Sequence, residues 1–268
     1  MTELSAAAEP LFIAVGTGDA MRTIAMRIRP AQPGHSGPAL LWLSGYRSDM
    51  SGTKAIEMDG LAERLGLASI RFDYSGHGLS GGAFTDGTIS RWLEEALAVV
   101  DHVRADSLLV VGSSMGGWIA LRLIEELRKR PTPPAVAGLV LIAPAPDFTS
   151  VLIEPNLSEV EKLSLSERGF FEERSQYSLE PNVFTRALIE DGRDNQVLAG
   201  IIDTGCPVHI LQGMQDDDVP YAHALRLIEH LPSDDVVLTL IRDGDHRLSR
   251  PQDIERMLDA IAALTGAA

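Results

Sequence analysis

The sequence has only one cysteine, Cys206, among its 268 residues. A single thiol cannot close an internal disulfide, which excludes a disulfide-stapled secreted scaffold, and its place before a proline favours a structural role. Basic residues are also scarce, because 23 lysines and arginines face 38 aspartates and glutamates for a net charge of −15. Such a charge opposes binding to nucleic acid or to an anionic membrane surface. We therefore expect no nucleic-acid partner.

Long apolar runs are missing as well. No stretch approaches the roughly 20 apolar residues that span a bilayer, so we expect no membrane insertion. The first ten residues lack the basic start and apolar core of a secretory signal, and they lack the arginines of a transit peptide. These features favour a cytoplasmic protein. The length suits a single α/β domain over residues 1–268 and carries no signal for an oligomeric state.

An apolar stretch, a tight glycine-serine turn and a helical pattern follow one another in the middle of the chain. Ser107–Val111 is typical of a buried strand, residues 118–130 are typical of a helix, and a Gly-x-Ser-x-Gly pattern joins them. This is the context of a nucleophile elbow. Its strained turn aims the serine outward, and Gly112 and Gly116 leave room where strand and helix pack too closely for side chains. The sequence therefore predicts Ser114 as a nucleophile.

Strands alternate with helices along most of the chain, which indicates a mostly parallel, eight-stranded-type sheet with helices on both faces. The sequence predicts strands over residues 11–15, 22–28, 39–43, 68–72, 107–111, 137–143, 207–212 and 236–241. It predicts one helix that ends near residue 66 and four others over residues 89–104, 118–130, 222–230 and 253–264. Ser90 is a possible cap of the second helix.

The alternation breaks over about residues 145–205, which we interpret as an insertion. A capping box at Ser158 predicts one helix, and a second is expected over residues 185–190 with Gly192 as its stop. An aromatic-rich insertion after a sheet strand is typical of a small helical lid over a pocket, although these aromatics would also pin it to the core. The aromatic residues of the insertion are Phe148, Phe170, Phe171, Tyr177 and Phe184. We expect the four phenylalanines to line the pocket.

An acyl-transfer site needs a base for its nucleophile and an acid that orients the base. Asp216 and His246 each follow a predicted strand, so they join Ser114 at the carboxyl edge of the sheet. The chain order Ser-Asp-His is that of the α/β-hydrolase fold. The oxyanion of such a reaction also needs donors, for which we expect the backbone N–H groups of Met115 and Tyr46.

Some of these residues have rivals in the sequence. Asp217 and Asp218 compete with Asp216, but the spacing from the preceding glycine to the following Val-Pro favours the first aspartate. His77 lies in another loop at the same edge, but it precedes the serine, so chain order favours His246.

Cofactor chemistry finds weak support. No histidine or cysteine spacing resembles a zinc site, and no calcium-loop pattern is present, so we expect neither metal nor cofactor. Gly76-x-Gly78-x-x-Gly81 matches a dinucleotide fingerprint. Its glycines open no helix, however, and no acidic residue ends a second strand about 20 residues later, which favours a flexible turn.

Several motifs resemble one branch of the α/β-hydrolase superfamily, which contains animal mitochondrial palmitoyl-protein thioesterases that also act as acyl-glucuronide esterases. The resemblance runs from about residue 38 to the end and rests on residues 44–55, 70–76, 111–118, 213–217 and 245–247. It implies the same nucleophile, triad partners and oxyanion donors as the residue patterns. Two positions depart from common hydrolase motifs, with Ser44-Gly45 in place of His-Gly and Gln212 in place of histidine.

The sequence thus predicts a serine hydrolase that acts on a small-molecule carboxylic ester or thioester with an apolar acyl group. The same triad also serves C–C bond hydrolases and peptidases, and a non-catalytic binding protein with this fold is a further alternative.

Overall fold

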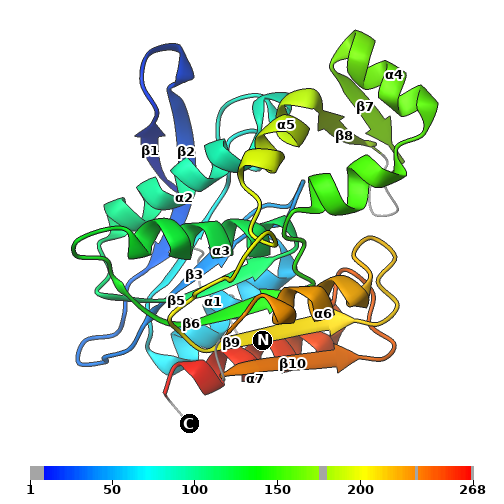
Figure 1. Cartoon of the computed structure of the whole chain (residues 1–268). Helices are drawn as coiled ribbons and strands as arrows, with labels where there is room; N and C mark the ends of the chain where they lie inside the picture. Colours follow the sequence, from blue (N-terminus) through cyan, green and yellow to red (C-terminus); the bar gives the residue numbers. More distant parts are fainter. Residues whose placement is uncertain (1–8, 175–179, 233–234, 267–268) are drawn as a thin grey trace.

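An eight-stranded sheet forms the centre of the molecule (Figure 1). The computed structural model describes residues 9–174, 180–232 and 235–266. The strand order is β1-β2-β4-β3-β5-β6-β9-β10, in which β2 runs antiparallel to both of its neighbours, β1 and β4, and every other pair of neighbouring strands is parallel. The strands are β1 Leu11–Val15, β2 Arg22–Arg29, β3 Ala39–Leu43, β4 Ser69–Phe72, β5 Ser107–Ser113, β6 Ala135–Ile142, β9 Val208–Gly213 and β10 Val236–Ile241. The predicted mostly parallel α/β sheet is confirmed.

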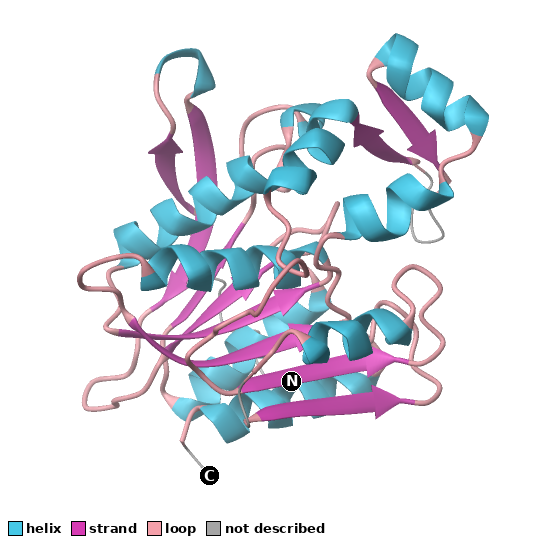
Figure 2. Cartoon of the chain, viewed as in Figure 1, coloured by secondary structure: helices cyan, strands magenta, loops and turns pink. Residues whose placement is uncertain are grey.

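Helices cover both faces of this sheet (Figure 2). One face carries α1 (Thr53–Leu65) and α7 (Pro251–Leu264), and the other carries α2 (Ile89–Val103), α3 (Met115–Arg128) and α6 (Tyr221–Glu229). Because strand side chains alternate between faces, each face of the inner strands supplies its own apolar core.

Two predicted helix boundaries differ in the structure. The cap of α2 is Thr88, whose hydroxyl accepts the N–H of Arg91, whereas Ser90 lies inside the helix. Gly192 does not stop the second helix of the insertion, because α5 continues to Asp194. A side chain at Gly192 would collide with Thr149, so packing explains this glycine better than helix termination.

The sequence predicts a helical insertion between β6 and β9, but the insertion also contains strands. It contains a π-helical turn, α4, a small antiparallel sheet and α5. The elements are η3 Thr149–Ile153, η4 Glu154–Asn156, α4 Glu159–Arg168, β7 Phe170–Glu173, β8 Asn182–Thr185 and α5 Arg186–Asp194. The capping box at Ser158 is confirmed at the start of α4. These elements stand above the sheet in Figure 1.

A buried aspartate ties the two ends of the insertion together. Asp147, with φ 55°, accepts hydrogen bonds from the N–H groups of Val197 and Leu198 at 2.9 and 2.8 Å.

Two parts of the sequence interpretation, Tyr177 and the first eight residues, lie outside the described residues. Within the described ranges, every helix is too short or too polar to cross a bilayer.

Candidate active site

Ser114 lies in the sharp turn between β5 and α3. Its backbone adopts φ 53° and ψ −119°, a conformation that costs energy for any residue with a side chain. The flanking glycines permit the turn, because a Cβ on Gly112 would lie 2.5 Å from the Gly116 carbonyl oxygen and one on Gly116 would lie 2.1 Å from that of Leu43. The strained backbone is thus fixed by close packing between strand, turn and helix.

His246 and Asp216 reach this serine from the ends of two neighbouring strands. Ser114 Oγ lies 3.0 Å from His246 Nε2, and His246 Nδ1 lies 2.8 Å from Asp216 Oδ2. The Asp216 side chain is fully buried, whereas that of His246 is 16% exposed. Since a carboxylate only accepts hydrogen bonds, it selects the tautomer with hydrogen on Nδ1 and leaves Nε2 free to accept the serine proton.

Four donors hold the carboxylate of Asp216. The N–H groups of Asp218 and Val219 donate to Oδ1 at 3.0 and 2.8 Å, and Gln212 Nε2 donates to Oδ2 at 3.0 Å beside the histidine. The neighbours Asp217 and Asp218 instead lie exposed at the cavity. The structure therefore pairs the first aspartate of the run with His246.

Tyr46 and Met115 are the two residues from which we expect oxyanion donors. Met115 is the first residue of α3, so its N–H has no acceptor within that helix. Tyr46 lies in a turn that closes with a 3.1 Å hydrogen bond from Ser48 N–H to the Gly45 carbonyl. Both Tyr46 and Met115 line the cavity at Ser114.

The side chain of Tyr46 joins this turn to the insertion. Its hydroxyl donates to the carbonyl of Val183, and its ring stacks on that of Phe184 with centroids 5.3 Å apart. Burial raises the pKa of Tyr46 well above its usual value, so the phenol remains a donor.

A cavity of about 700 Å³ opens between the triad and the insertion. Phe148 and Phe184 line it, together with Leu152 and Ile153. Phe170 and Phe171, which we expected at the pocket, are not among its lining residues. Phe171 packs behind Phe184 at 5.3 Å between ring centroids, and Phe170 lies under the guanidinium of Arg168 at 4.3 Å. Alternation along β7 sends these two rings to opposite faces of the strand.

Comparison with known proteins agrees with this architecture. Residues 15–264 match the model of the alpha/beta hydrolase family. The chain belongs to the α/β hydrolase family. It is 32% identical to human palmitoyl-protein thioesterase ABHD10, mitochondrial, over 84% of this chain and 72% of the human protein. The resemblance to the thioesterase branch is therefore confirmed.

Solved structures of similar proteins support the same assignment. A putative hydrolase from Agrobacterium vitis S4 is 67% identical, with a TM-score of 0.94 over 96% of this chain and 98% of that one. Mouse alpha/beta hydrolase domain-containing protein 10 is 28% identical, with a TM-score of 0.82 over 96% of this chain and 98% of the mouse chain. The similarity to both structures includes the region of the insertion, because it covers nearly the whole chain.

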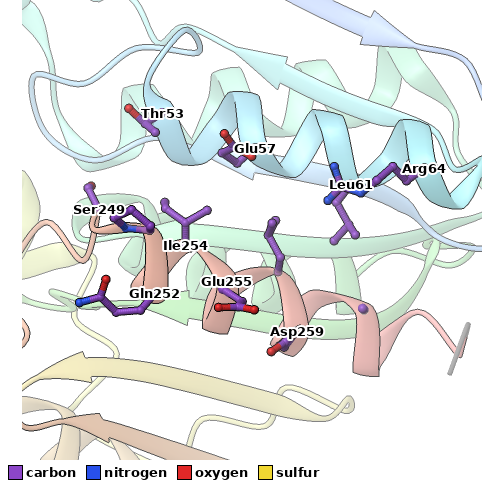
Figure 3. Close-up of a pocket in the computed structure, with 12 residues that line it drawn as sticks. Thr53, Glu57, Leu61, Arg64, Ser249, Gln252, Ile254, Glu255 and Asp259 are labelled. Carbon is purple, nitrogen blue, oxygen red and sulfur yellow. The ribbon is translucent and has the colours of Figure 1, made fainter. Parts of the chain in front are cut away.

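This α/β hydrolase has a second hollow away from the triad. A groove of about 810 Å³ runs between α1 and α7 on the opposite face of the sheet (Figure 3). Its lining includes Glu57, Arg64 and Glu255, but no triad residue. The cavity lined by Ser114 and His246 is therefore the better candidate for a reaction site.

Metal and dinucleotide binding fit the structure less well. Asp216, Asp218 and His246 each place one potential ligand atom within 4.8 Å of the others. Both oxygens of Asp216 already accept hydrogen bonds, and His246 Nδ1 faces this carboxylate, so we still expect no metal.

The glycine-rich loop after β4, which matches a dinucleotide fingerprint in sequence, folds back on β2, with Gly81 N–H donating to the Thr23 carbonyl at 2.8 Å. It opens no helix that could bind a pyrophosphate.

Sequence reasoning missed several charged residues of the cavity, among them Lys54 at the start of α1. Its ammonium donates to the carbonyl of Arg247, directly after His246, and to Ser249 Oγ at 3.2 Å. Burial, with a smaller effect of Arg247, lowers the pKa of Lys54 to about 8. Its only signal in the sequence was its place within residues 44–55, one of the stretches that carry the family resemblance.

Proposed function

We propose that this protein is a serine hydrolase that cleaves carboxylic esters or thioesters with an apolar acyl group. The observation that carries the proposal is the continuous chain of contacts from Ser114 Oγ through His246 to the buried Asp216. A nucleophile, a base and an orienting acid in this arrangement suit acyl transfer.

In the proposed reaction, Ser114 Oγ forms a bond to the substrate carbonyl carbon while His246 Nε2 accepts its proton. The carbonyl electron pair moves to oxygen, where the N–H groups of Tyr46 and Met115 stabilise the negative charge. Collapse expels the alcohol or thiol, which takes the proton from His246. Water then gives a proton to His246 and attacks the acyl group, and the acid leaves as Ser114 Oγ regains its proton.

The cavity supports an apolar acyl group as the substrate's common feature. Phe148, Leu152, Ile153 and Phe184 offer an apolar wall from the insertion, which we propose acts as a lid. The name of the human relative, a palmitoyl-protein thioesterase, supports a thioester substrate. C–C bond hydrolysis, peptide cleavage and a non-catalytic binding role remain alternatives that the first experiment and a substrate series separate.

Labelling with a fluorophosphonate probe tests the nucleophile directly. We expect the wild type to be labelled and Ser114→Ala to lose both labelling and turnover, with kcat lower by roughly 10⁴-fold or more. Ser107→Ala, at the opposite end of the same strand, is the matched control and should retain both. Near-normal turnover in Ser114→Ala would refute the proposed mechanism.

A substrate series then defines the chemistry. We expect p-nitrophenyl esters and acyl thioesters to be hydrolysed, with kcat/KM rising as the acyl chain lengthens. A protein that binds fatty acyl compounds but hydrolyses none of them, despite correct folding, would favour the binding role.

A further inference from the structure

The turn that holds the proposed oxyanion donor Tyr46 has an unfavourable backbone. Its third residue, Arg47, adopts φ 56°, in the left-handed region that suits glycine. The hydrogen bond from Ser48 N–H to the Gly45 carbonyl closes the turn but is compatible with either orientation of the central peptide between Tyr46 and Arg47. Another contact must therefore fix this peptide.

His77 supplies that contact from the loop after β4. Its Nε2 accepts the N–H of Arg47 at 3.2 Å, and its Nδ1 lies 3.1 Å from the carbonyl oxygen of Ser75. The two partners determine the tautomer, because a carbonyl can only accept and an amide N–H can only donate. His77 therefore carries its hydrogen on Nδ1 and a lone pair on Nε2.

The surroundings of His77 keep the ring in place and uncharged. Only 6% of the residue is exposed, and its ring lies edge-on to those of Tyr74, Phe84 and Trp92, with centroids 5.1–6.0 Å apart. Burial lowers the pKa of His77, which favours the neutral ring. A neutral, immobile imidazole is a well-defined acceptor for one backbone N–H.

We propose that His77 is a positioning residue of the oxyanion turn: it fixes the peptide between Tyr46 and Arg47, with Arg47 in the left-handed conformation, and so holds the turn that carries the Tyr46 N–H in one shape beside Ser114. This inference rests on the proposed hydrolase function. The side chain of Arg47 does not replace His77, because its contacts with Glu180 and the Pro181 carbonyl act through a long, rotatable chain. The imidazole acts on the backbone itself.

Two amide substitutions separate this role from a structural one. The side-chain oxygen of His77→Gln lies as many bonds from Cα as Nε2 and can accept the Arg47 N–H. The amide of His77→Asn instead matches Nδ1, so it can donate to Ser75 but cannot reach Arg47. We expect His77→Asn to lower kcat about tenfold with KM within about twofold of wild type, and His77→Gln to restore most of the loss. A role in holding the Ser75 loop would reverse this order.

Further measurements identify the origin of any loss. Hydrogen exchange of the Arg47 amide, followed by NMR, should accelerate at least tenfold in His77→Asn and remain slow in His77→Gln. His209→Asn, which removes an imidazole that contacts Thr239 elsewhere in the sheet, should leave kcat and the Arg47 amide unchanged. Thermal unfolding of each variant is measured to show that the variant is folded at the temperature of the kinetic assays.

Equal kcat in His77→Asn and wild type, equal losses in the two His77 variants, or a change in KM alone would overturn the inference. Failure of the hydrolase proposal is recognised separately, because the wild type would then show no labelling that depends on Ser114. The exchange rate of the Arg47 amide would still test whether His77 holds the turn.

Discussion

Gln212 offers a sharp test of the site because its buried amide faces only acceptors. Its Nε2 lies 3.1 Å from the carbonyl oxygen of Gly213, 3.0 Å from Asp216 Oδ2 and 3.0 Å from the carbonyl oxygen of Val219. The residue is fully buried. Gln212→Glu would place an oxygen among these three acceptors, and Gln212→Leu would remove the donor without adding a charge.

The two variants should differ in a way that depends on pH. Gln212→Leu leaves two buried carbonyls short of a donor, which we expect to cost about 2–4 kcal/mol of unfolding free energy. In Gln212→Glu, burial and the adjacent Asp216 raise the pKa of the introduced carboxyl in the folded state, and we take this rise as about 3 units. Each unit corresponds to about 1.4 kcal/mol, so its ionisation opposes folding by about 4 kcal/mol.

The direction follows from proton binding. The folded Gln212→Glu variant binds the extra proton more tightly than its unfolded chain, whose carboxyl has a pKa of about 4.3. The stability of Gln212→Glu relative to Gln212→Leu is therefore greatest below that pH. Stability is then lost as pH rises through the raised folded value. In urea unfolding, we expect Gln212→Glu to lose about 3 kcal/mol relative to Gln212→Leu between about pH 5 and pH 8. Parallel pH profiles for the two variants would refute the donor role of Gln212.

Two further predictions concern the cavity. Because the folded pKa of Lys54, about 8, lies below the unfolded value of about 10.4, the unfolded chain binds more protons between them. The stability of wild type relative to Lys54→Met should therefore rise by about 1–3 kcal/mol as pH increases across this window, and equal slopes in urea unfolding would contradict the shift. Phe148→Ala should move the preferred acyl chain to greater length in an ester series, whereas Phe170→Ala, outside the cavity, should not. An unchanged preference in both variants would remove Phe148 from the acyl-binding wall.

The sheet and the position of the site followed from local patterns in the sequence. Buried parallel strands are recognisable as short apolar runs. Gly112 and Gly116 mark the turn after β5, and the structure shows that this turn packs too closely for a side chain at either position. Since the carboxyl ends of parallel strands meet at one edge, Ser114, Asp216 and His246 could be brought together without knowledge of the loops.

The insertion and the supporting contacts could not be predicted in the same way. Strands β7 and β8 are four residues long and are stabilised by pairing with each other, so neither has a clear pattern of its own. The contact of Lys54 with Arg247 joins residues 193 positions apart, and that of His77 with Arg47 joins positions 30 apart. Such contacts depend on tertiary packing, which a motif does not encode.

Ser44-Gly45 stands where many hydrolases have His-Gly, and the contacts of these two residues explain why this departure is compatible with the site. The hydroxyl of Ser44 is buried and accepts the indole N–H of Trp42 at 3.0 Å. A Cβ on Gly45 would lie 3.2 Å from the Ser113 carbonyl oxygen and 3.3 Å from the Ser114 Cβ, so glycine meets a need for close approach. The glycine serves the elbow, whereas the residue before it is fixed by a neighbour in β3. A histidine at position 44 is therefore not required to hold this turn beside Ser114.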